Sequence, residues 1–249
     1  MGSFVILFKK ELKSNLRTHR ILIVAAVFFV LGLGTPLILK YLHVFLPADT
    51  TDIVIPEFAA IDVIVGYLDS LGQVGLLLAI LVAMGSVARE RESGTAAMTL
   101  SKPVGCGPFV AAKLAALALV FAIGIVVGAV GCYLYTAVLF ESTGVMDFFL
   151  ATLLAALYLL FCLAVTVMYS CFFKSQLPAG GLALVTLIAL TATSSLPVMK
   201  EYSPGALLSW SESIVSGSGS NAWGAVIVSL GLIVLTAVIG WQVFKVKEL

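Results

Sequence analysis

The sequence is poor in charge, in cysteine and in histidine. Only 11% of its 249 residues are charged and 61% are hydrophobic, whereas about 25% of the residues in a soluble domain carry charge. This composition excludes a water-soluble enzyme and a nucleic-acid-binding protein, and four cysteines give no disulfide framework for a secreted scaffold. The net charge of +1 is too balanced to indicate a polyanionic partner, so we expect no nucleic acid to bind.

Groups that bind metals or carry out catalysis are equally scarce. The four cysteines lack the paired spacing of metal ligands, and the two histidines are expected on opposite sides of a membrane. No predicted span contains a His, Asp or Glu that could activate a nucleophile or bind a coupling ion, because Asp62 and Asp69 are expected to precede the second span. The sequence therefore predicts no catalytic residue and no metal site, and it argues against an ion-driven carrier.

Long apolar runs, in contrast, are abundant. Six runs without charge are long enough to cross roughly 30 Å of hydrocarbon as helices, which takes about 20 residues. They are 21–39, 70–88, 114–140, 148–173, 175–199 and 213–244, and the last helix is expected to begin near Ala222. We predict an all-α membrane protein, a six-transmembrane-helix bundle in which residues 1–249 form a single domain.

The lysines and arginines predict the orientation of this bundle. Twelve of the fourteen fall in segments on one side of the six spans, and only Lys40 and Lys200 fall on the other side. Positive residues near span ends tend to stay in the cytoplasm. Both termini are therefore predicted to be cytoplasmic, and residues 200–221 are predicted to be extracytoplasmic.

Residues 1–20 are predicted to form a cytoplasmic amphipathic helix. Apolar residues recur there at helical spacing and basic residues occupy the other face; the two sets are Val5, Phe8, Leu12 and Leu16, and Lys9, Lys10, Lys13 and Arg17. Such a helix lies along the inner membrane surface with its basic residues near anionic headgroups. Membrane lipid is therefore an expected partner.

The one long cytoplasmic loop, 89–113, contains signals for a short separate helix. Gly94 can end the preceding helix, Thr95 can cap a new one, and Pro103 stops it. Its small and apolar side chains suit a groove on a partner, and the preceding alternating charges suit the rim of that groove. A charge cluster that only sets topology is the alternative, but it leaves the Gly-Thr start and the Pro stop unexplained. The residues expected to contact the partner are Arg89, Glu90, Arg91, Glu92, Gly94, Thr95, Ala97, Met98, Leu100 and Pro103.

At these residues the sequence resembles the permease subunits of ABC-2 type ABC transporters, and in particular the branch associated with multicopper-enzyme maturation. The matching residues are Glu90-Arg91-Glu92, Gly94-Thr95, Leu100, Ser101-Lys102-Pro103 and Phe109-Val110 with Lys113. The pair Gly105-Cys106 departs from the Ser-Arg that family members often carry. The six spans and the basic N-terminal helix extend the resemblance over nearly the whole chain.

The resemblance implies a division of labour between polypeptides. The loop would contain a coupling helix that rests on cytoplasmic ABC ATPase subunits, and a second permease copy would complete a homodimer in a prokaryotic inner or plasma membrane. The chain contains no Gly-Lys dipeptide and hence no phosphate-binding loop of the Gly-x-x-x-x-Gly-Lys type. ATP and Mg are therefore expected in the partner ATPase, and no cofactor is expected in this chain.

Two patterns within the spans leave their roles open. Gly124 and Gly128 form a GxxxG motif, which allows two helices to approach closely, either within one chain or between two copies. Polar span residues such as Thr166, Ser170 and Thr191 either line a substrate path or form backbone and interhelical hydrogen bonds, which is the more frequent use.

Two functions remain compatible with the sequence. The first is the transmembrane subunit of an ATP-driven transporter that forms the substrate path and couples to separate ATPase subunits. The alternative is a non-transporting membrane scaffold that recruits a cytoplasmic partner for assembly or signalling. Both share the spans and the loop, so only the dependence of cargo movement on ATP separates them.

Overall fold

The structure is a computed structural model that describes residues 2–42, 58–94, 105–140, 144–193, 201–218 and 221–248. Within these ranges the regular structure is entirely helical, which confirms the predicted all-α fold. The helices are α1 (Gly2–Arg17), α2 (Arg20–Lys40), α4 (Ala60–Ala83), α5 (Ala88–Glu92), α7 (Cys106–Leu139), α8 (Val145–Phe172), α9 (Gln176–Ala192), α10 (Ala206–Ser216) and α11 (Trp223–Glu248).

Five of these units are long and apolar enough to cross a membrane: α2, α4 together with α5, α7, α8 and α11. Helix α9 is apolar but has 17 residues, which extend about 26 Å at 1.5 Å per residue. It forms the first part of the predicted span 175–199, of which residues 194–199 lie outside the described part of the chain. The chain is thus a helical membrane bundle, as predicted.

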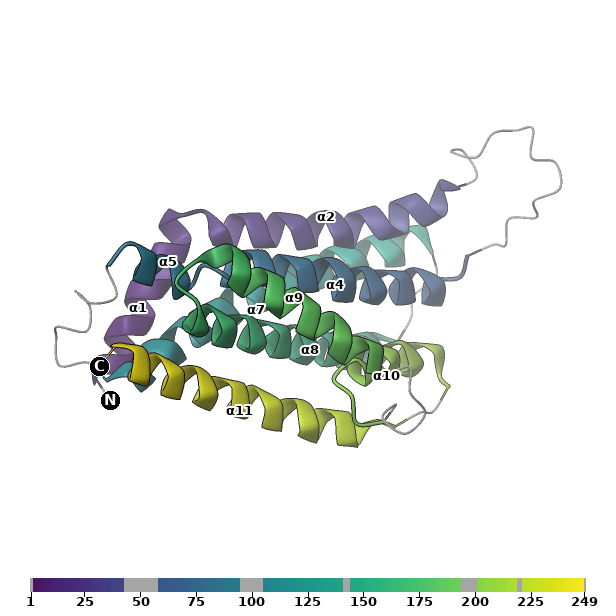
Figure 1. Ribbon diagram of the computed structural model, residues 1–249. Coiled ribbons are helices and arrows are strands. Elements are labelled where there is room, and N and C mark those ends of the chain that lie inside the picture. Colours follow the sequence, from purple (N-terminus) through teal and green to yellow (C-terminus); the bar gives the residue numbers. More distant parts are fainter. Residues whose placement is uncertain are drawn as a thin grey trace.

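The long helices alternate in direction (Figure 1). As a result α1, α5, the start of α7 and the C-terminal end of α11 lie together, whereas α10 and the end of α2 lie at the opposite end. We call the first the basic end, because ten of the described lysines and arginines belong to its segments: Lys9, Lys10, Lys13, Arg17, Arg20, Arg89, Arg91, Lys113, Lys174 and Lys245. Lys40 lies at the other end, where its Nζ donates to the carbonyl of Leu139 at 3.3 Å.

The second span begins earlier than the sequence predicted. Helix α4 starts at Ala60, so Asp62 and Asp69 lie in the same helix as the predicted span 70–88, within the ten residues before that charge-free run. The Asp62 carboxylate accepts a hydrogen bond from the Ala59 N–H at 2.8 Å, and Asp69 accepts one from Gln73 at 2.8 Å. Free N–H groups at a helix start stabilise negative charge, which explains why Asp62 is tolerated in the first turn.

The third span is also extended at its start. Helix α7 begins at Cys106, so residues 106–113 of the predicted loop 89–113 are helical. Lys113 therefore lies in the helix that continues into the predicted third span. The contacts that permit this are described below.

Helix α2 packs against α7 through glycines. A Cβ atom at Gly124 would lie 2.8 Å from Cδ2 of Phe28, and one at Gly128 would lie 2.6 Å from the Phe28 carbonyl oxygen. A Cβ at Gly32 would overlap the carbonyl of Gly128. The two backbones thus approach more closely than larger residues permit, and the GxxxG motif contacts a helix of the same chain.

We predict that Gly32→Ala lowers the stability of the bundle, whereas Gly34→Ala on the same helix does not. The methyl group at residue 32 would meet backbone atoms that cannot move aside, at a cost of about 1–3 kcal/mol. A methyl group at residue 34 has open space around it and gains up to about 1 kcal/mol in helix propensity. Thermal unfolding in detergent micelles checks this, and equal midpoints for the two variants would contradict the close contact between α2 and α7.

Candidate functional site

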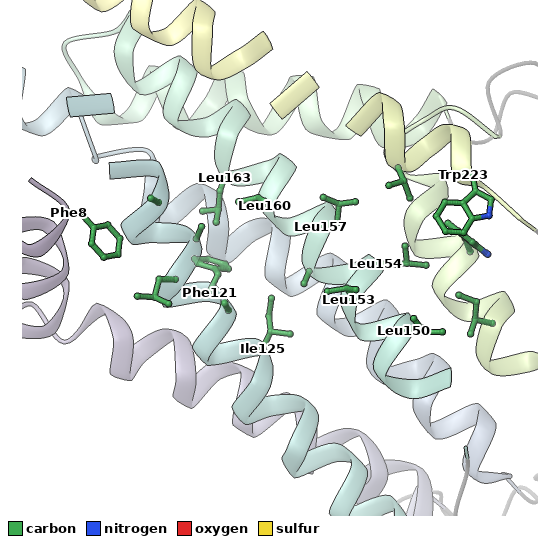
Figure 2. A pocket seen from close by; sticks show the side chains of 18 of the residues that line it. Phe8, Phe121, Ile125, Leu150, Leu153, Leu154, Leu157, Leu160, Leu163 and Trp223 are labelled. Atoms are coloured by element: carbon green, nitrogen blue, oxygen red, sulfur yellow. The ribbon is translucent and has the colours of Figure 1, made fainter. Parts of the chain in front are cut away.

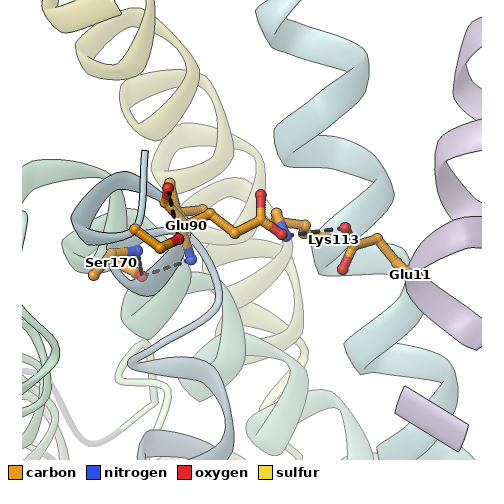
Figure 3. A network of polar contacts seen from close by, with 7 residues as sticks. Glu11, Glu90, Lys113 and Ser170 are labelled. Atoms are coloured by element: carbon orange, nitrogen blue, oxygen red, sulfur yellow. Dashed lines mark hydrogen bonds and ion pairs between the residues drawn. The ribbon is translucent and has the colours of Figure 1, made fainter. Parts of the chain in front are cut away.

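A serine from α8 holds the break between α4 and α5. The N–H groups of Val87 and Ala88 donate to the Ser170 hydroxyl oxygen at 3.0 and 2.9 Å, and that hydroxyl donates to the Met84 carbonyl at 2.8 Å (Figure 3). A break in a helix leaves such backbone groups without their usual partners. The fully buried Ser170 supplies the partners and thereby attaches α5 to α8.

The four charged residues of α5 are divided between the interior and the surface. Arg91 donates from Nη1 to the Cys171 carbonyl at 2.8 Å, so it covers one of the last carbonyls of α8. Glu90 also points into the chain, towards α7. Arg89 and Glu92 are exposed. Only these two are therefore oriented as the sequence had suggested for all four, with their charges available to a partner.

Glu90 meets a buried lysine that also binds α1. The Nζ of Lys113, whose side chain is 3% exposed, lies 2.7 Å from Oε1 of Glu90 and 3.0 Å from Oε1 of Glu11 (Figure 3). It also lies 5.0 Å from the centre of the Phe109 ring. We call Glu11, Glu90 and Lys113 the Lys113 bridge. A charge buried to this extent is costly unless it is paired, so the bridge requires α1, α5 and α7 to stay together.

Helix α1 contacts the bundle through a face that the sequence did not predict. Leu7 and Asn15 are buried and Glu11 is partly buried, and their spacing of four residues places them on one side of the helix. The predicted apolar residues Val5 and Leu16 remain exposed, as are the basic residues Lys9, Lys10, Lys13 and Arg17. The helix is therefore amphipathic, but part of its polar side is bound to α7 rather than to water.

The segment expected to bind the partner starts within α5, at Arg89, and continues beyond the end of that helix. Gly94 has a left-handed backbone with φ of +70°, and a side chain there would meet nothing within 4 Å. The helix thus stops at the position where the sequence predicts a break. The other predicted contact residues, Thr95, Ala97, Met98, Leu100 and Pro103, lie outside the described part of the chain.

A large apolar cavity of about 1010 Å³ lies between α7 and α8. Figure 2 shows Phe8 of α1 at one end of it, Trp223 of α11 at the other, and leucines of α8 along its wall. None of the described residues that line it carries a charge. The cavity therefore fits hydrocarbon, such as acyl chains, an apolar helix face or the apolar part of a cargo.

Three residues of this site were not among the predicted contact residues: Glu11, Lys113 and Ser170. Two of them left a signal in the sequence, since Glu11 is the only acidic residue among the first twenty and Lys113 ends the motif that begins at Glu90. Ser170 appeared only as one polar span residue among several. Thr166 and Thr191 donate to carbonyls in their own helices at 2.8 and 3.0 Å, which is the more frequent use expected for such residues.

Comparison with known proteins assigns the chain to a family. The model of the ABC-2 family transporter proteins matches residues 5–249. The chain belongs to this ABC-2 family. An ABC-2 family chain is a multi-span transmembrane subunit of an ABC transporter and is not itself the catalytic component. A relative of the ABC-2 chain is the uncharacterized transmembrane protein YxlG of Bacillus subtilis (strain 168), which is 26% identical over 203 residues that cover 80% of this chain and 77% of that protein.

We predict that Lys113→Met destabilises the ABC-2 protein by about 3 kcal/mol, because it leaves two partly buried carboxylates beside each other without their counter-charge. Lys40→Met is a matched control, since Lys40 lies 5.1 Å from the Phe140 ring centre but is exposed and has no described carboxylate beside it. Its loss should cost less than about 1 kcal/mol. Thermal unfolding in detergent measures both variants.

A second comparison separates the charge from the packing of the lysine stem. We expect the triple variant Lys113→Met, Glu11→Gln, Glu90→Gln to recover much of the lost stability, because all three charges are removed together. If the triple variant is as unstable as Lys113→Met, the lysine contributes through packing and the ion pairs are not what holds the three helices.

Proposed function

We propose that this ABC-2 protein forms the substrate path of an ATP-driven transporter and receives movement from separate cytoplasmic ATPase subunits through residues 89–103. The observation that carries the proposal is the Lys113 bridge. It binds α5, the helix at the start of this segment, to two other helices, one of which is a candidate membrane span.

The contacts of α5 suit the transmission of force. Helix α5 is attached to α8 through Ser170 and the Cys171 carbonyl, and to α7 through Lys113. A displacement of α5 therefore moves α7 and α8, which form the walls of the apolar cavity. Helix α2 follows α7 because their backbones are in close contact.

The orientation follows from the basic end, which we propose to be cytoplasmic, in a prokaryotic plasma membrane. The ATPase subunits would bind there, and ATP and Mg would belong to them. We further propose a homodimer of this chain with two ATPase subunits, with the cargo path between the copies. The uncharged lining of the cavity favours a cargo with a substantial apolar part.

The contacts of α5 also favour a transporter over the alternative scaffold. A scaffold needs only an accessible docking segment, and a flexible tether serves that purpose. Here the docking segment begins with a helix, α5, that is bound to α7 and α8 by hydrogen bonds and an ion pair with the buried Lys113.

We expect Gly94→Pro to abolish coupling, because proline fixes φ near −65° where the chain requires +70°. The measurement does not require the cargo to be known. Leu157→Cys places a thiol in the apolar cavity. The rate at which a thiol reagent labels this cysteine is measured with and without ATP, in liposomes that contain the chain and its ATPase. A Cys106→Ser background removes the one native cysteine that is not buried. The wild-type background should show a labelling rate that changes with ATP, and Gly94→Pro should not.

A matched control, Gly217, lies at the end of the bundle opposite the basic end. Gly217 also has φ of +70°, also ends a helix and also has open space around it, so Gly217→Pro should perturb the backbone equally but leave the ATP-dependent change intact. Asparagine tolerates the left-handed conformation, so Gly94→Asn should retain coupling. This variant separates the effect of the backbone angle from a general effect of any substitution at residue 94 on folding. An unchanged ATP response in Gly94→Pro, or an equal loss in Gly217→Pro, would show that this segment does not couple the two subunits.

A further inference from the structure

A second cavity, which is polar, lies beside the Lys113 bridge. It has a volume of about 280 Å³ and is lined by α1, the start of α2, the break after α4, and α5. At about 30 Å³ per water molecule it has room for roughly nine waters. A small anionic group with part of its hydration shell therefore fits the space.

Two arginines without ion-pair partners border this cavity. Arg20 begins α2 and Arg89 belongs to α5, and both line the cavity. Neither forms an ion pair with any described residue. Arg20 lies within electrostatic range of Arg89 and also of Glu11 and Glu90, the two carboxylates of the Lys113 bridge. Glu11 and Glu90 also line the cavity but are bound to Lys113, so the two guanidinium groups remain without a direct ion pair among the described residues. Such groups suit phosphate, whose oxygens match the paired N–H donors of arginine.

The wall of the cavity also holds unused polar groups. Asn15 is 4% exposed and Ser86 is 8% exposed, and both line the cavity. Among the described residues no partner is found for the Ser86 hydroxyl, and the Asn15 side chain forms no hydrogen bond with them. Buried polar groups are normally hydrogen-bonded. These two groups therefore leave donors for a ligand, next to the two arginines.

The charges of the site can be summed. Lys113 and the two carboxylates that it binds carry a net charge of −1, and Arg20 and Arg89 add +2, so the lining has a net charge of +1. A phosphodiester carries one negative charge and neutralises this lining. A free phosphate ion carries more than one negative charge on average at neutral pH and would leave a net negative charge.

We propose that this cavity binds a phosphate group, with Arg20 and Arg89 as its charged ligands, and that the phosphodiester of a membrane phospholipid is its source. The phosphate would link the start of α2 to α5 across the cavity. The Lys113 bridge binds α5 to α1 and α7 but not to α2, so the lipid would add this fourth helix. Only the choice of the inner leaflet as the source depends on the orientation proposed above.

The experiment uses the full chain in detergent and follows its thermal unfolding during titration with short-chain phosphatidylglycerol. Ligand that binds the folded state raises the midpoint in a concentration-dependent way. We expect saturable stabilisation of the wild type, and an affinity about tenfold weaker for each arginine replaced in Arg20→Gln and Arg89→Gln. Lys9→Gln with Lys13→Gln is the matched control, because it removes two exposed cations from the same end and should leave the affinity unchanged.

Two further titrations distinguish the sources of phosphate. Inorganic phosphate that reaches the same plateau through the same arginines, with no additional gain from the lipid, would assign the site to the free ion. Short-chain diacylglycerol, which has no phosphate, should give no stabilisation that depends on Arg20 or Arg89.

Three results would overturn the proposal. The first is equal lipid affinity in the arginine variants and the wild type, and the second is an equal loss in the lysine control. The third is stabilisation by the ATPase subunit that depends on Arg20 and Arg89 and removes the effect of the lipid, which would mean that an acidic side chain of that partner occupies the cavity. Arg89→Gln alone keeps the test valid if Arg20→Gln does not fold, because Arg89 is exposed and forms no ion pair with the described residues.

Discussion

A buried ammonium group must keep its counter-charges near it, and this requirement determines the arrangement of the basic end. Desolvation of an ion costs several kcal/mol even after the protein relaxes, so Lys113 is stable only with both carboxylates in place. Those carboxylates come from helices 102 residues before it and 23 residues before it in the chain. The position of α1 against α7, and the inward orientation of Glu90, both follow from this one charge.

The rest of the molecule divides into closely packed and open parts. Glycines bring the backbones of α2 and α7 together, and Ser170 replaces the backbone hydrogen bonds that the break before α5 leaves unmade. Between α7 and α8, in contrast, a large apolar cavity remains. Under the function proposed here, helices that move as a unit at the basic end would change the width of this cavity, and hydrocarbon would fill it in each state.

The sequence predicts five of the spans well, because long apolar runs have no other stable location than a membrane, and α9 covers the described part of the sixth run. It predicts their ends less well, because a helix start stabilises Asp62 and a pair of carboxylates stabilises Lys113, and neither effect is visible in a charge-free window. Gly94 is predictable from its residue type alone. The inward orientation of Glu90 and Arg91 is not, since alternating charges have the same pattern whether they meet solvent, a partner or their own chain. The role of Ser170 depends on which residues α8 lies beside, and that is a property of the fold.

The account depends most on the claim that α1, α5 and α7 form one rigid unit. The direct measurement is the distance between spin labels at Lys13→Cys on α1 and Glu92→Cys on α5, both exposed positions, in a Cys106→Ser background with the ATPase bound. A single narrow distance distribution that is the same with and without ATP, and that broadens in Lys113→Met, is the predicted result. A distance that changes with ATP in the chain that retains Lys113, or a distribution that stays narrow in Lys113→Met, would contradict the account.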